Sequence, residues 1–236
     1  MKAKLFIWAF GILVFGFQSS RAQHVAEEHE HRFLHPFLVH MALPDEPGDI
    51  SVRISPFQER LGSVTVRDVG VHIEAGLLPR LGLHVRSDAI QKGDYTELMI
   101  MYAPLQNASL SKGISIFGQV SIPTGPIESN KYKTLFGLAA RETIGEFVVI
   151  NANVHVNAKE NMAELESSFV FRASEKLYPV FETHSEIAEE EGHTSGLFGL
   201  KFKVSHHSGL GFGFQFPFTQ EKEFDVQTLA TIDMAF

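Results

Sequence analysis

The sequence predicts an all-β protein, an antiparallel transmembrane β-barrel of about twelve strands, with ten strands as an alternative. Polar and apolar residues alternate with period two from about residue 49 to the C-terminus, as on strands that present two different faces. Several alternating segments reach the roughly 9–11 residues that a tilted membrane strand needs, beyond the 5–6 of a typical globular strand. After residue 22 there is no run of about 18 apolar residues that would indicate a membrane helix.

The first 22 residues have the pattern of an export signal. Lys2 and Lys4 precede the apolar run Leu5–Phe17, and the small residues Ser20 and Ala22 fit cleavage before Gln23. The run is shorter than the roughly 20 residues that a membrane-spanning helix requires. We therefore expect residues 1–22 to be a cleaved signal peptide and the protein to reach the outer membrane of a Gram-negative cell.

Residues 23–48 form a leader rich in histidine and acid, which we expect on the periplasmic side ahead of the first strand. Imidazole and carboxylate groups suit Zn²⁺, Cu²⁺ or Ni²⁺. The chain has no cysteine and the leader has no fixed metal motif, so a solvated acidic leader remains the alternative. Weak binding of a divalent metal would use His24, His29, His31 and His35. No other cofactor is expected.

We expect the barrel to occupy residues 49–236. The twelve predicted strands lie near 49–57, 64–76, 80–88, 95–104, 112–121, 132–143, 147–157, 163–173, 177–187, 195–204, 209–217 and 224–236. Most even-numbered connections are tight, whereas several odd-numbered ones are longer and polar, as expected for periplasmic turns and external loops. The alternation changes phase near Arg67 and Asp68, which we interpret as a β-bulge or a shortened strand.

Alternation alone does not say which face of the strands is enclosed. A soluble periplasmic β-protein would bury its apolar face, whereas a membrane barrel turns that face to lipid and keeps the polar face inside. The polar rows contain Gly, Asn and charges of both signs, which suits a filled or watery lumen. The sequence therefore favours the membrane barrel.

The C-terminus carries a family resemblance. The segment Thr228–Phe236 (TLATIDMAF) ends an alternating strand on Phe236, and it resembles the signature that the outer-membrane assembly machinery recognises. The stretch Gly199–Phe236 is similar to the end of small barrel proteins described as transporters, including the family named for the MetA pathway of phenol degradation. This resemblance implies a barrel fold but no particular solute.

The inward polar rows are the candidate functional region. On this register the lumen is lined by His72, Glu74, His84, Arg86, Arg141, His155, Glu164, Glu166, Arg172, Glu182, Lys201, Lys203, Asp225 and Asp233. The same register turns Arg53, Glu97, His184 and Glu186 inward. These charges could pair with one another as a filling, or they could line a polar, weakly cation-preferring pathway. A barrel of twelve strands has room for a slim channel, particularly one that its leader can plug.

Several other functions are disfavoured. A net charge of −8 argues against nucleic-acid binding, and the absence of cysteine excludes disulfides and cysteine nucleophiles. No G-x-S-x-G, H-E-x-x-H or phosphate loop is present, so we expect no enzyme. We expect a channel or facilitator for a small solute, with the lipid bilayer and the assembly machinery as partners. A non-conducting structural or metal-binding barrel is the alternative.

Overall fold

The computed structural model describes residues 35–91, 95–107, 109–124, 132–157, 161–188, 192–219, 222 and 224–236. Within these ranges the chain forms twelve strands. They are β1 (Ile50–Leu61), β2 (Val64–Leu78), β3 (Leu81–Ser87), β4 (Tyr95–Gln106), β5 (Lys112–Pro123), β6 (Lys133–Ile144), β7 (Val148–Asn157), β8 (Met162–Phe171), β9 (Leu177–Ile187), β10 (Thr194–Ser205), β11 (Ser208–Pro217) and β12 (Val226–Ala235). No helix in the described ranges is long and apolar enough to cross a membrane.

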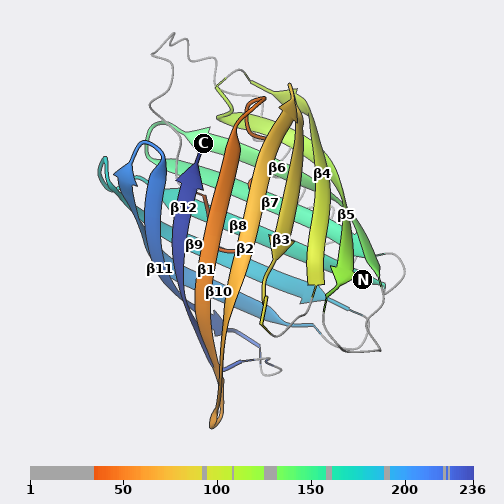
Figure 1. The fold of residues 1–236 in the computed structure, drawn as a ribbon, viewed down its shortest axis with the longest axis vertical. Helices are drawn as coiled ribbons and strands as arrows, with labels where there is room; N and C mark the ends of the chain where they lie inside the picture. Colours follow the sequence, from red (N-terminus) through yellow and green to blue (C-terminus); the bar gives the residue numbers. More distant parts are fainter. Residues whose placement is uncertain are drawn as a thin grey trace. The chain divides into compact units, whose positions relative to one another are not determined.

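The strands form one closed antiparallel barrel, which confirms the predicted fold class and the count of twelve (Figure 1). Each strand pairs with its neighbours in the chain, and β1 closes the cylinder against β12 with Ser51 opposite Ala235 and Arg60 opposite Val226. At the seam, the amide of Phe236 donates to the carbonyl of Ile50 at 2.8 Å. Closure pairs the strand edges, as required where no water is available to hydrogen-bond an open edge.

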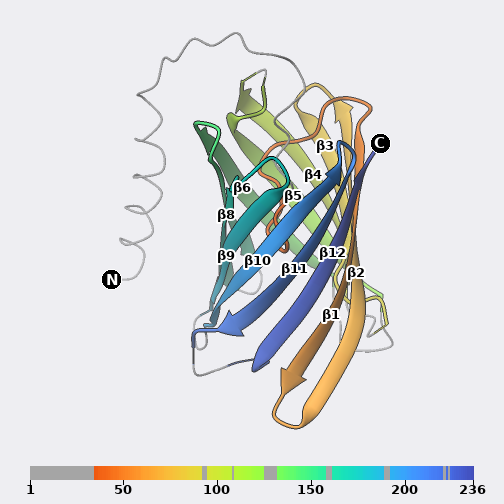
Figure 2. The same cartoon turned by 90° about the vertical axis from the view of Figure 1, so that its left-hand side faces the viewer.

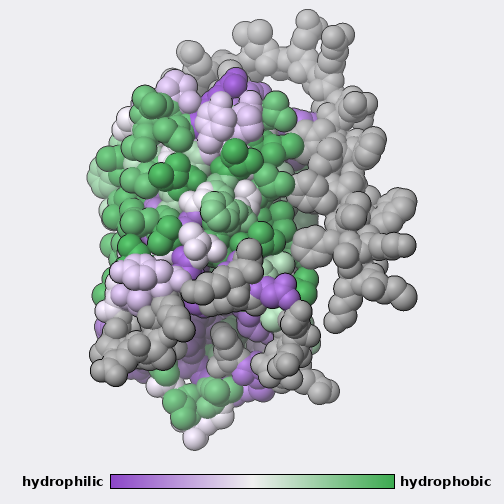
Figure 3. Space-filling model, turned by 90° about the vertical axis from the view of Figure 1, so that its right-hand side faces the viewer, coloured by the Kyte–Doolittle hydropathy of each residue, from purple (hydrophilic) through white to green (hydrophobic). Residues whose placement is uncertain are grey.

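The alternation along the strands separates an apolar outside from a polar inside. On β11, Phe212, Phe214 and Phe216 are exposed on the outer surface, whereas Gly213 and Gln215 between them are buried. Figure 3 shows hydrophobic side chains covering much of one side of the barrel wall. An apolar outer surface around a polar interior is the arrangement of a barrel that faces lipid.

The predicted bulge or shortened strand near Arg67 and Asp68 is wrong, because β2 runs unbroken from Val64 to Leu78. The pairing of β1 with β2 runs without a shift from Ile50 opposite Ala75 to Leu61 opposite Val64. β3 pairs with β2 only from Val71 onward, so the β1–β2 hairpin extends beyond the end of the barrel (Figure 2). The polar/apolar alternation changes there because this part of the hairpin has no enclosed inner face. An apolar residue such as Val64, 60% exposed, can therefore occupy that face of β2.

Connections at the two ends of the barrel differ. One end carries the even-numbered connections, from β2–β3 to β10–β11, and also holds Ile50 and Phe236; we call it the even-numbered end. Its turns are short, such as Pro79–Arg80 and His206–His207. At the other end most connections are longer, except that β1 and β2 are joined by Gly62 and Ser63 alone. Gly62 has φ +58°, a left-handed conformation that permits so tight a turn.

Depth-dependent substitution tests the lipid-facing surface. Leu200 lies at the middle of β10 and Val204 near its end, and both side chains point outward. Leu200→Arg should lower the free energy of unfolding in lipid vesicles by about 2–4 kcal/mol, and Val204→Arg by about 0–1 kcal/mol, because a charge costs most at the bilayer midplane. Denaturant titration measures both values. Equal losses at the two positions would contradict a membrane-spanning wall.

Candidate functional site

Part of the described chain ahead of β1 lies inside the barrel. Residues 35–44, here called the plug, lie in the lumen that the strands enclose, as the orange trace in Figure 2 shows. Phe37, Val39 and Ala42 are 2%, 1% and 0% exposed. The leader was expected ahead of the first strand, and over its described part it enters the lumen.

A buried carboxylate fastens the plug. Glu182, on β9, accepts hydrogen bonds from three consecutive backbone amides, those of Phe37, Leu38 at 2.8 Å and Val39 at 3.1 Å. Glu182 is 2% exposed, so its charge has little access to bulk water. Hydrogen bonds to an ionised acceptor are roughly twice as strong as neutral ones, so these three bonds hold the plug firmly.

Donors around the wall satisfy the carbonyl groups of the plug. Lys201 donates to Pro36 at 3.3 Å, Arg53 to Phe37 at 2.9 Å and Arg86 to Leu38 at 3.2 Å. Asn153 donates to His40 at 3.3 Å, and Ser115 to Ala42 at 2.6 Å. The donors stand on β10, β1, β3, β7 and β5. An irregular segment therefore finds hydrogen-bond partners around the lumen without secondary structure of its own.

The side chain of Phe37 packs against a part of the wall formed by glycine residues. A Cβ atom placed at Gly211 would lie 2.8 Å from the ring of Phe37, and one at Gly199 would also collide with it. Lys201 Nζ lies 4.9 Å from the centre of the same ring. The glycines of β10 and β11 thus leave the space that this aromatic side chain fills.

Charges beside the plug are paired. Asp233 lies 2.8 Å from Lys201 Nζ and 3.1 Å from Arg53 Nε, and all three side chains are buried. Pairing of this kind is needed because an isolated buried charge is costly. These pairs correspond to the charge-paired filling, one of the two interpretations of the lumen charges that the sequence allowed.

Histidines gather next to these charges, on the neighbouring strands β2 and β3. His72 Nε2 and His84 Nδ1 lie 3.3 and 3.8 Å from one carboxylate oxygen of Glu74, and His35 Nδ1 lies 3.6 Å from the other. His40, in the plug, contacts Arg86 Nη1 through Nε2 at 3.1 Å. Burial, followed by the charge of Arg86, lowers the pKa of His40 well below its usual value.

A cavity of about 560 Å³, here called the vestibule, extends from the plug toward the odd-numbered connections. Glu97, Glu164 and Glu166 line it together with Glu59 and Asp88, against the bases Arg53 and Arg86. His155 and His184 lie 3.4 and 3.3 Å from Glu164. Five acids against two permanently charged bases make the vestibule acidic.

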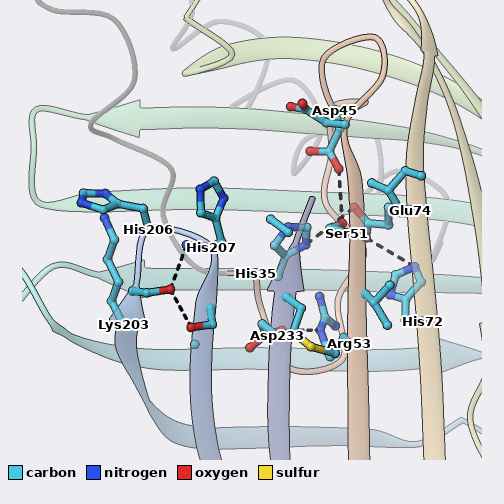
Figure 4. A pocket seen from close by; sticks show the side chains of 18 residues that line it. His35, Asp45, Ser51, Arg53, His72, Glu74, Lys203, His206, His207 and Asp233 are labelled. Carbon is cyan, nitrogen blue, oxygen red and sulfur yellow. Dashed lines mark hydrogen bonds and ion pairs between the residues drawn. The ribbon is translucent and has the colours of Figure 1, made fainter.

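A smaller cavity of about 70 Å³ lies toward the even-numbered end (Figure 4). His35, Glu74 and the Arg53–Asp233 pair line it, with His206 and His207 at its mouth. Residues of the plug line both cavities, Phe37, Leu38 and His40 in the vestibule and His35 here. The plug thus lies between them.

The predicted lumen residues fall into two groups. Those on the strands point inward: His72, Glu74, His84, Arg86, Arg141, His155, Glu164, Glu166, Glu182, Lys201 and Asp233 are buried or half-buried, and Lys203 lines the mouth of the smaller cavity. Arg172 and Asp225 lie in connections, outside the strands. There, the hydrogen bond from Lys222 and that from the amide of Gly62 hold the pKa of Asp225 below its usual value.

Most of the histidines predicted to bind metal lie outside the residues that the structure describes. His24, His29 and His31 lie outside the described residues, whereas His35 stands beside Glu74. The sequence did not indicate that His40 would meet His72 and His84, because nothing local shows that the leader folds back into the lumen. The inward glycine row of β11 was the available signal, since glycines leave space that another segment can occupy.

Comparison with known proteins supports the fold. No family model matches the chain, and no curated protein matches it. An outer-membrane channel from Pseudomonas putida F1 superposes with a TM-score of 0.61 at 9% identity, covering 83% of this chain and 98% of that one. The KdgM porin, solved in complex with disordered oligogalacturonate, gives 0.55 at 8% identity over 80% and 98%.

The NanC porin also gives a TM-score of 0.55, at 8% identity over 79% of this chain and 98% of its own. At such low identity these likenesses establish the fold alone, that of small outer-membrane channels. The narrower resemblance to the MetA-pathway family stays a prediction.

The anchoring role of Glu182 can be measured with a single cysteine, since the chain has none. Val39→Cys places a thiol on the buried plug, and Glu182→Ala removes the acceptor of three amides. Each hydrogen bond to a charged group is worth about 1.5–3 kcal/mol, so maleimide labelling in detergent should accelerate at least about tenfold. Glu186→Ala, on the same strand but paired with His193, is the control. An unchanged rate in Glu182→Ala would contradict the anchor.

Proposed function

We propose that this chain is an outer-membrane channel that conducts small polar solutes, prefers cations, and is closed at rest by its plug. The bilayer would surround the apolar outer surface described above. The observation that carries the proposal is the polar lumen of a twelve-stranded barrel, filled between its two cavities by a segment held through non-covalent contacts. Such a segment can leave the lumen once its hydrogen bonds to the wall, including those to Glu182, are broken.

Charge supports the preference for cations. The vestibule is acidic, and a narrow polar path lined by carboxylates enriches cations and repels anions. KdgM is described with oligogalacturonate, which is an anionic oligosaccharide. We propose a different solute class for this chain, cationic or uncharged, because Glu97, Glu164 and Glu166 would repel a polyanion at the vestibule wall.

A second candidate function is a non-conducting barrel. It is favoured by the density of contacts between plug and wall, where Glu182 alone accepts three amides. In that case the plug would be a permanent filling that stabilises the barrel. Conductance of variants that lack the plug separates the two candidates.

Planar-bilayer recording tests the plug. Deletion of residues 23–47 should raise single-channel conductance at least about tenfold over the mature chain, because the lumen loses its filling between two cavities. Deletion of residues 23–34 is the matched control, since it keeps the plug, and its conductance should stay low. A folded 23–47 deletion that carries no current would contradict the channel and favour the non-conducting barrel.

Reversal potentials test ion preference. The test combines Glu97→Gln, Glu164→Gln and Glu166→Gln in the 23–47 deletion. The reversal potential in a KCl gradient should shift toward the chloride equilibrium potential, because carboxylates that attract cations are removed from the vestibule. Glu175→Gln, in the exposed β8–β9 connection, should leave it unchanged. An unselective pore before the substitutions would contradict the proposed preference.

A further inference from the structure

Three histidines from distant parts of the chain meet beside the plug. His40 belongs to the plug, His72 to β2 and His84 to β3, where it stands opposite Glu74. Their ring centres lie 5.0, 5.9 and 5.7 Å apart, and one nitrogen from each ring lies within 4.8 Å of the other two. They are 5%, 6% and 2% exposed, so this is an interior cluster.

The cluster holds polar atoms without hydrogen-bond partners. Among the described residues, His40 Nδ1, His72 Nε2, His84 Nδ1 and both carboxylate oxygens of Glu74 have no partner in hydrogen-bond geometry, although His72, His84 and His35 lie at ion-pair distance from Glu74. A buried polar atom left in this way costs about 1–3 kcal/mol. Three imidazoles and one carboxylate that converge in this way form a donor set that a cation can bind.

The donor set suits a divalent transition metal. Imidazole nitrogens bind Zn²⁺ at about 2.0–2.1 Å, and three imidazoles with a fourth ligand give a tetrahedral site. The three nitrogens lie within 4.8 Å of one another and would approach to about 3.3 Å when all three bind one ion. Glu74, whose Oε1 lies 3.3 Å from His72 Nε2, supplies the negative charge that offsets the ion.

In the described part of the chain, two cations lie near the cluster: Arg53, which stands opposite His72 and pairs with Asp233, and Arg86, which must be accommodated. Arg86 contacts His40 Nε2 at 3.1 Å, and it also binds Asp88 at 2.5 Å and the carbonyl of Leu38 at 3.2 Å. When His40 offers Nδ1 to a metal, Nε2 carries the ring proton and releases Arg86. The guanidinium keeps its other two partners, and Asp88 balances its charge.

We propose that His40, His72 and His84 bind one divalent transition metal ion, with Glu74 as fourth ligand or counter-charge. Because His40 lies on the plug and the other two on the wall, the ion joins the plug to β2 and β3. This site differs from the one predicted in the leader, which used His24, His29, His31 and His35. Metal binding here does not depend on whether the barrel conducts.

Zinc titration tests the site. The folded mature chain in detergent, with His24, His29 and His31 replaced by Gln, should bind one Zn²⁺ by calorimetry with a Kd below about 10 µM. His72→Gln and His84→Gln should each weaken binding at least about tenfold, as should His40→Gln, which alters only the plug. His155→Gln, another buried lumen histidine, should bind like the parent. Absence of zinc binding in the parent, or unchanged binding in His72→Gln and His84→Gln, would overturn the proposal.

A spectroscopic measurement guards against variants that fail to fold. Zinc-edge X-ray absorption of the parent protein should show about three imidazole ligands at roughly 2.0–2.1 Å. Fewer than two imidazoles would place the ion elsewhere and overturn the site. Heat-dependent mobility on gels identifies the folded variants that enter the comparison.

Discussion

The hydrogen bonds between Glu182 and three plug amides are the interaction on which the interior depends. A carboxylate that is 2% exposed needs donors, and Phe37, Leu38 and Val39 provide them from the backbone. The dependence is mutual, because the plug has no secondary structure and its amides need acceptors in the lumen. Wall donors such as Arg53 and Lys201 complete the arrangement by binding carbonyl groups of the same segment. Plug and wall therefore form one hydrogen-bonded unit.

One alternation pattern serves both surfaces of the barrel. On β11 the aromatic residues, such as Phe212 and Phe214, face outward, and the glycines between them face the lumen. The outer side suits lipid, and the inner side leaves the space that Phe37 occupies. The histidine cluster adds a third feature, because His40 brings a plug residue next to two wall residues. A metal ion there would act on the same plug that Glu182 holds.

The strands and most of the side chains that face the lumen were predictable from the sequence, whereas the contacts of the plug were not. Period-two patterning located all twelve strands, because side-chain direction on a strand depends only on residue parity. The same rule gave a wrong interpretation of the phase change at Val64. Parity does not reveal where β3 ends and where the β1–β2 hairpin extends beyond the barrel. The docking of Phe37 on Glu182 joins positions 145 residues apart in the chain, and no local pattern encodes such a contact. For the same reason His40 could not be placed beside His72 and His84.

Amide hydrogen exchange at Phe37, Leu38 and Val39 tests the central claim most directly. Exchange is slow where an amide is buried and hydrogen-bonded, and fast where a segment opens to water. In the folded barrel these three amides should exchange as slowly as those of the barrel strands, and Glu182→Ala should speed them while the strands stay protected. Exchange at the rate of an open loop in the unaltered protein would contradict a plug held inside the barrel.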